Sequence, residues 1–259
     1  MKNVDVTKLD NIIFLKCGSI SDINICMYKD KKYVYKEFLD PAKVIDDAFI
    51  DRFKLLSSKK LKQAVLPTHM VVSSGEKVGY LTPRLEKKNI LTISDPLERY
   101  YALVDTKKAI ENLHNNDIIH GDIHAGNILI KNNKHCLIDF DNCEIPSSKS
   151  VKLDLDKCCI SAMNYINTNG VVKNLDIYMF NVLTFFAFNV NFNNCIFLEE
   201  IFDNVRSSIY HGKCGIFSND NSKRACEDIY LYNSKDYLID TITEEDVKVY
   251  KKQLLYKNM

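Results

Sequence analysis

Three oxygen-bearing side chains in one short stretch, residues 118–141, could together hold a divalent cation. Asp122 and Asn127 lie five positions apart, and Asp139 follows two short apolar runs that flank a turn rich in Asn and Lys. The apolar runs and the turn predict a β-hairpin, which would bring the three side chains into one small volume. Carboxylate and amide oxygens suit Mg2+, which is usually bound by few protein ligands and by the oxygens of a phosphate group.

The order of these residues resembles the catalytic core of the protein-kinase-like superfamily. In that family an Asp accepts the proton of the substrate hydroxyl, and a following Asn and a later Asp bind metal. The resemblance therefore implies that Asp122 is the catalytic base and that Asn127 and Asp139 are Mg2+ ligands. Gly121 and His124 stand where eukaryotic protein kinases usually have Arg and Lys. These variants resemble atypical bacterial protein kinases and the aminoglycoside and choline kinases.

The roles of three neighbouring residues follow from the same resemblance. His120 is expected to pack and bond inside the catalytic loop. His124 replaces a Lys that touches the γ phosphate, so it either makes that contact, as part of the catalytic set, or only packs. Asp141 stands where the family usually has Gly. It either adds a metal contact or bonds to the backbone at the end of the hairpin.

The chain ahead of this core predicts a small lobe built on an antiparallel sheet with one helix. Alternating apolar residues and turn residues between them predict three strands and then a hairpin. The three strands are expected over residues 12–17, 23–28 and 33–38, the helix over about 41–57, and the hairpin over 65–72 and 78–81.

The resemblance places the ATP phosphates against this small lobe. Gly18, Ser19 and Ile20 correspond to the Gly-rich loop that covers the phosphates, although only the middle glycine remains. Lys36 corresponds to the lysine that holds the α and β phosphates. It lies between apolar residues on one face of its strand, where a buried ammonium needs a charged partner.

In the family, an acid on the following helix is the partner of that lysine. The predicted helix has no Glu, and Asp47 and Asp51 are the candidates. We favour Asp51, which would reach Lys36 with a side chain one methylene shorter than the usual Glu.

We expect one α+β domain with the bilobal protein-kinase-like fold. The small lobe is predicted over residues 1–83, the hinge over about 84–88, and a mainly helical large lobe over 89–259. Backbone groups near Arg84 and Leu85 are expected to take the edge of the adenine ring.

The large lobe is predicted to contain several helices. Ser94 is a candidate cap for the first of them. Residues 177–190 are apolar nearly all round, as a buried helix would be, and Thr243 can cap a last amphipathic helix. The family also has a buried Asp at the start of the helix after the activation segment, and we expect Asp156 or Asp154 in this place.

Composition excludes few partners but gives several expectations. The 259 residues carry a net charge of +1, which does not point to nucleic acid as a partner. Nine cysteines show no regular metal-site or disulfide spacing, so a reducing compartment is expected. The N-terminal residues do not resemble a signal peptide, and no apolar run is long enough for a membrane span. We therefore expect a cytoplasmic protein without a membrane partner.

The resulting prediction is an ATP- and Mg2+-dependent kinase of the atypical protein-kinase type that phosphorylates Ser or Thr of a protein. The short distance from the hinge to His120 leaves no room for the helical insertion with which aminoglycoside and choline kinases usually hold small substrates. Gly121 and His124 nevertheless favour a small-molecule kinase. The degraded glycine loop and the missing helix Glu favour a pseudokinase that acts as a binding module. An enzyme that transfers AMP is a further alternative.

Overall fold

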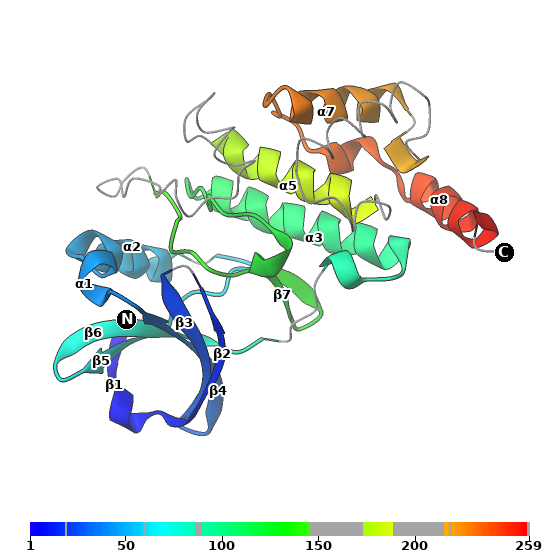
Figure 1. Cartoon of the computed structure of the whole chain (residues 1–259). Helices are drawn as coiled ribbons and strands as arrows, with labels where there is room; N and C mark the ends of the chain where they lie inside the picture. Colours follow the sequence, from blue (N-terminus) through cyan, green and yellow to red (C-terminus); the bar gives the residue numbers. More distant parts are fainter. Residues whose placement is uncertain are drawn as a thin grey trace.

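The molecule has two lobes of different composition (Figure 1). The computed structural model describes residues 1–18, 20–59, 61–85, 90–145, 173–188, 215–217 and 219–257. A curved six-stranded sheet with two helices beside it forms the first lobe, and the second is mainly helical with one two-stranded sheet. The bilobal α+β architecture predicted from the sequence is thereby confirmed.

The small-lobe sheet has the strand order β1-β5-β6-β4-β3-β2. Its strands are β1 (Lys2–Asp5), β2 (Asp10–Cys17), β3 (Ser21–Tyr28), β4 (Lys31–Phe38), β5 (His69–Ser73) and β6 (Glu76–Pro83). The five strands that correspond to the prediction pair antiparallel. The sequence did not predict β1, which pairs parallel with β5 and makes the sheet mixed.

The sheet curves strongly because consecutive strands occupy its two edges (Figure 1). The short 3-10 helix η1 (Val6–Lys8) links β1 at one edge to β2 at the other. One face carries an apolar cluster of its own, which includes the buried side chain of Tyr35. Since side chains alternate along a strand, the neighbouring Lys36 and Phe38 face the other side. There Phe38 joins the main core, which also contains the helices.

The single helix predicted over residues 41–57 is broken into two. Helix α1 (Pro41–Val44) is one turn long, and α2 (Asp47–Ser58) begins after a new cap. Asp46 has an extended backbone, and its Oδ1 accepts a hydrogen bond from the amide of Phe49 at 2.7 Å. This break sets which face of α2 turns inward, because the helical phase starts again at the cap.

The large lobe is built on two long helices, α3 (Pro96–His114) and α5 (Lys173–Phe188) (Figure 1). Its other described elements are η2 (Ile90–Thr92), η3 (Ala125–Asn127), β7 (Ile128–Lys131), β8 (Lys134–Leu137), η6 (Gly215–Phe217), α7 (Asp220–Tyr230), η7 (Leu238–Thr241) and α8 (Glu244–Lys257). Among the residues that the structure describes, no helix has both the length and the apolar character needed to cross a bilayer.

The caps of two large-lobe helices test the predictions at their ends. Asp95 rather than Ser94 caps α3, since its Oδ1 accepts from the amide of Leu97 at 2.8 Å and a proline follows it. At the start of α8, the prediction is confirmed. Thr243 and Asp246 bond reciprocally through their side chains and amides, as in a capping box.

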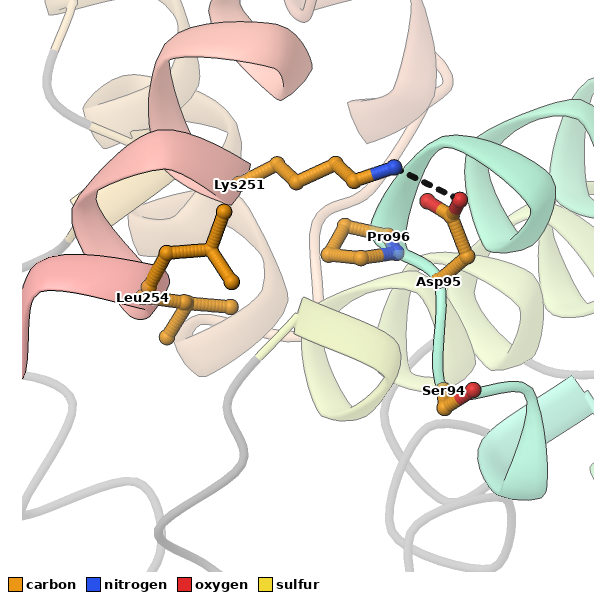
Figure 2. A pocket seen from close by; sticks show the side chains of 6 residues that line it. Ser94, Asp95, Pro96, Lys251 and Leu254 are labelled. Atoms are coloured by element: carbon orange, nitrogen blue, oxygen red, sulfur yellow. Dashed lines mark hydrogen bonds and ion pairs between the residues drawn. The ribbon is translucent and has the colours of Figure 1, made fainter. Parts of the chain in front are cut away.

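Helix α8 packs across the start of α3 at a hollow of about 290 Å³ (Figure 2). Nζ of Lys251 on α8 lies 2.7 Å from the carboxylate of Asp95, and Pro96 and Leu254 line the same hollow. Helix α8 is also held by Val247, which is buried in the main core, and by Tyr250, whose hydroxyl donates to the carbonyl of Phe188 at 2.7 Å.

Strands β4 and β6 approach each other so closely at Gly79 that one added methyl group should destabilise the protein. A Cβ at Gly79 would overlap the backbone carbonyl oxygen of Lys36 and lie 2.9 Å from the ring of Tyr35. Gly79→Ala should therefore lower the free energy of unfolding by about 2 kcal/mol, because the paired backbones must separate. Chemical denaturation measures this loss. Glu76→Ala, at an exposed position of the same strand, is the control and should change it by less than about 0.5 kcal/mol. Equal stability of the two variants would contradict the packing described here.

Candidate active site

The predicted hairpin forms and brings the ends of its strands together. Asn132 and Asn133 occupy the turn between β7 and β8 with φ of 51° and 59°, the left-handed conformation that tight hairpins require. The amide of Ile138 donates to the carbonyl of Asn127 at 3.0 Å. Asn127, at the start of the hairpin, therefore lies beside the segment that carries Asp139.

Asp122 lies within reach of two side chains of its own loop. Nδ2 of Asn127 donates to Oδ2 of Asp122 at 2.9 Å, and Nε2 of His124 lies 3.7 Å from the same oxygen. Burial by itself disfavours the charged carboxylate. The interactions with His124, with the charge of His120 and with Asn127 outweigh it and hold the pKa of Asp122 below its usual value. Asp122 is thus ionised near neutral pH and can accept a proton.

His120 ties the loop to the hairpin. Its ring is fully buried against Phe140, with ring centroids 4.8 Å apart. Nε2 of His120 lies 2.9 Å from the carbonyl oxygen of Ile138. The side chain therefore packs and bonds inside the loop, in agreement with the expectation from the sequence.

Asp176 is a buried residue that anchors this loop through its backbone amides. Its Oδ2 accepts from the amide of His120 and its Oδ1 from the amide of Gly121, both at 2.8 Å. Oδ2 also lies 3.0 Å from Nε2 of His114, at the end of α3. The side chain has no exposed surface, so two amides and an imidazole replace its lost hydration.

Asp176 makes the contacts that we expected from Asp156 or Asp154, which lie outside the described residues. Asp176 lies in the first turn of α5 and is its one acid. The sequence could have indicated this anchoring role, because Asp176 is a single acid at the start of a helix that is otherwise mostly apolar. The segment from Asp139 to Asp176 is more than twice as long as the segment to Asp156. The stretch between the hairpin and this buried Asp is therefore longer than the sequence predicted.

Lys36 crosses from the small lobe to two carboxylates of the large lobe. Its Nζ lies 2.7 Å from Oδ1 of Asp139 and 2.7 Å from Oδ2 of Asp141. Burial disfavours the ammonium, but the two carboxylates outweigh that effect and raise the pKa of Lys36. Burial and the charge of Asp141 raise the pKa of Asp139. Asp139 also has a φ of 64°, a left-handed backbone conformation that costs energy for residues other than Gly.

The predicted ion pair between Lys36 and Asp51 is wrong. The carboxylate of Asp51 is 69% exposed and binds Lys54 of its own helix at 3.0 Å. The residue that follows, Arg52, points inward instead, and its Nη1 lies 3.4 Å from the carbonyl oxygen of Cys143. Asp47, the other candidate, is also exposed. Because α2 begins at the Asp46 cap, its acids fall on the outer face.

The residues predicted to contact the nucleotide come between β2 and β3 and directly after β6. The amide of Gly18 donates to the carbonyl of Ser21 at 2.7 Å, which joins the end of β2 to the start of β3. Ile20 is half-buried against the main core, and Ser19 lies outside the described residues. After β6, Arg84 is exposed and Leu85 is half-buried. The contacts of these residues with a nucleotide remain predictions.

The donor set fits a magnesium ion on phosphate. Asp139 and Asp141 bind one ammonium, and the charge of Asp122 also acts on Asp139, so the site carries an excess of negative charge that a dication would neutralise. In the described part of the chain, no group of three or more His, Cys, Asp or Glu side chains could hold a metal ion by itself. Mg2+ does not need such a group, since one or two protein ligands and phosphate oxygens suffice. Asp139 and the side-chain oxygen of Asn127 would be those ligands.

One comparison with known proteins gives a match. The model of a family described as protein tyrosine and serine/threonine kinase matches residues 25–193, well over half of the chain. The matched range includes Lys36, Asp122, Asn127 and Asp139. No curated protein matches the chain.

Mutation of Asp176 tests whether this buried carboxylate stabilises the protein more than an exposed one does. Asp176→Asn should lower the free energy of unfolding by about 3 kcal/mol, because its amide presents N–H groups to a backbone donor in place of a carboxylate oxygen. Chemical denaturation and amide hydrogen exchange at His120 and Gly121 measure the effect.

The matched control for this change is Asp117→Asn. Asp117 binds Lys173 but its side chain is 76% exposed, so the loss should stay below about 0.5 kcal/mol. If Asp176→Asn were as stable as this control, with unchanged exchange in the loop, the anchoring role would be excluded.

Proposed function

Because this chain belongs to the protein tyrosine and serine/threonine kinase family, we propose that it transfers the γ phosphate of Mg-ATP to a Ser or Thr hydroxyl of a protein. The observation that carries the proposal is the contact between Lys36 and Asp139, which joins the two lobes at 2.7 Å beside the loop of Asp122 and Asn127.

Each side chain of this cluster has one task in the proposed reaction. Asp122 orients the attacking hydroxyl and accepts its proton, and its lowered pKa keeps it ionised for this purpose. Asn127 and Asp139 would hold Mg2+, and the bound ion would supply neutralisation of the phosphate charge. Lys36 holds the phosphate oxygens from the small lobe. Phosphoryl transfer depends mainly on such positioning and charge neutralisation, so few groups are needed.

The choice of a protein substrate rests on the shortness of the segment between β6 and the loop of His120. Between β6 and the loop of His120, the described residues contain only η2 and α3. This part of the described chain has no additional helical unit that could hold a small molecule, which favours a protein substrate. The atypical subtype rests on Gly121, on His124 and on Asp141 in the metal-binding motif.

A small-molecule kinase is the second candidate function. Gly121 and His124 favour it, because the same residue types resemble those of the aminoglycoside and choline kinases. In that case the same cluster would phosphorylate the hydroxyl of a small alcohol, with Asp122 in the same role.

Labelled ATP separates these functions. The purified protein with Mg2+ and ATP labelled at the γ position should phosphorylate itself or added protein, and Asp122→Ala should reduce the rate by at least about 100-fold, because the catalytic base is lost. Asp51→Asn changes an exposed acid away from the cluster and should leave the rate unchanged. Retained melting temperatures show that both variants are folded.

The other outcomes each exclude this proposal. Label transferred from the α position points to AMP transfer, and consumption of ATP only after addition of a small alcohol points to the second candidate. A wild-type protein whose melting temperature does not respond to Mg-ATP would be a pseudokinase that does not bind nucleotide.

A further inference from the structure

We propose that Asp141 is the positioning residue for Lys36, in place of an acid on helix α2, and that the hydroxyl of Tyr80 fixes Asp141 in turn. The proposal rests on the proposed function in one respect, that Lys36 holds the phosphates of a nucleotide. It assigns Asp141 neither to the metal nor to the backbone, the two roles that the sequence left open.

Both carboxylate oxygens of Asp141 already have a partner. Oδ1 accepts a hydrogen bond from the hydroxyl of Tyr80 at 2.7 Å, and Oδ2 lies 2.7 Å from Nζ of Lys36. Tyr80 on β6 is the direct neighbour of Lys36 on β4 in the sheet register. Neighbours of this kind present their side chains on the same face, so both reach the same carboxylate.

The two acids that bind Lys36 differ in the exposed fraction of their side chains. The side chain of Asp139 is 33% exposed, whereas that of Asp141 is 8% exposed and that of Lys36 is 10% exposed. Asp139 is therefore accessible to a metal ion from solvent. Asp141 would first have to give up the lysine or the tyrosine, which would leave a buried polar group without its partner.

Helix α2 offers no alternative partner for the lysine. Its buried residues are Phe49, Arg52, Phe53 and Leu56, and Arg52 is a cation. The acids of α2 lie on the other side, and Asp51 binds Lys54. The carboxylate that would come from this helix in the family comes here from the segment after the hairpin.

The arrangement explains how Lys36 remains in place when the site is loaded. An ammonium has three N–H donors. If Asp139 were to hold a metal ion, Asp141 would still be an anionic partner of Lys36. The other donors of the ammonium would then be free for phosphate oxygens. A shift of α2 would leave this anchor intact, since Lys36, Tyr80 and Asp141 all lie outside that helix.

The affinity for ATP in the absence of metal tests the proposal, because the two explanations predict changes of opposite sign for Asp141→Asn. A fluorescent ATP analogue in EDTA gives the dissociation constants of the wild type, Asp141→Asn, Lys36→Met and the double variant. Asp141→Asn removes a negative charge, which by itself should strengthen the binding of a polyanion. If Asp141 positions Lys36, the variant should instead bind about tenfold more weakly, equivalent to about 1.4 kcal/mol.

The double variant shows whether the effect passes through the lysine. In the Lys36→Met background, Asp141→Asn should not weaken binding further, because there is no ammonium left to position. An equal loss in both backgrounds would mean a general structural effect and would overturn the proposal.

Tyr80→Phe supplies a second, milder variant. It keeps the buried ring and removes only the hydroxyl, so metal-free ATP should bind about threefold more weakly, a loss typical of one hydrogen bond. Asp51→Asn is the matched control and should bind as the wild type does. Melting temperatures establish that each variant is folded, and if Asp141→Asn is not folded, Tyr80→Phe decides.

Two further outcomes overturn the inference. If Asp141→Asn binds metal-free ATP as tightly as the wild type or tighter, but loses the gain from Mg2+, Asp141 is a metal ligand. If the wild type binds no ATP even with Mg2+, the proposed function fails as well. Wild-type binding with an unaffected Asp141→Asn refutes only the role of Asp141.

Discussion

A buried ammonium held between two carboxylates is the interaction on which the arrangement of the candidate site depends. Lys36 belongs to the sheet of the small lobe, whereas Asp139 and Asp141 belong to the large lobe. Charges removed from water must be paired with good geometry, and removal of one partner leaves the other uncompensated. The two lobes are therefore held in the relative position that keeps Lys36 in contact with both acids.

Backbone contacts between the lobes support the same position. The amide of Val65, ahead of β5, donates to the carbonyl of Leu137 at 2.9 Å, and the amide of Leu137 donates to Gln63 at 2.8 Å. Arg52 of α2 reaches Cys143 just beyond the acids. On the far side of the loop, Asp176 fixes the amides that precede Asp122. The loop of Asp122 is thus anchored by Asp176 of the large lobe, and the neighbouring Asp139 and Asp141 are bound by Lys36 of the small lobe.

Local patterns in the sequence were enough to predict the parts of the site that depend on neighbouring residues. The spacing of Asp122 and Asn127, the turn at Asn132 and the apolar strands gave the hairpin, and alternation along β4 gave the inward direction of Lys36. Both features follow from short-range geometry. The two-lobed fold was implied by the resemblance of residues 118–141 to the protein-kinase-like superfamily, and the predicted order of strands and helices agreed with it.

The errors come from contacts between distant parts of the chain and from small shifts of helical phase. The cap at Asp46 restarts the helix and turns Asp51 outward, which a continuous helix would not do. Asp176 meets the loop of His120 only in the folded molecule, so its partners could not be read locally. The pairing of β1 with β5 is likewise a contact between segments far apart in sequence, and it gives a short strand with little pattern of its own.

The most direct test of the central claim, that these side chains converge on a metal–nucleotide complex, is the binding of Mn2+ followed by electron paramagnetic resonance. With a non-hydrolysable ATP analogue present, the wild type should hold Mn2+ in a complex with protein and nucleotide, and Asp139→Asn should lose it. Without nucleotide, both proteins should bind Mn2+ weakly, because the protein supplies too few ligands by itself. Equal Mn2+ binding by the wild type and Asp139→Asn in the presence of the analogue would contradict the account.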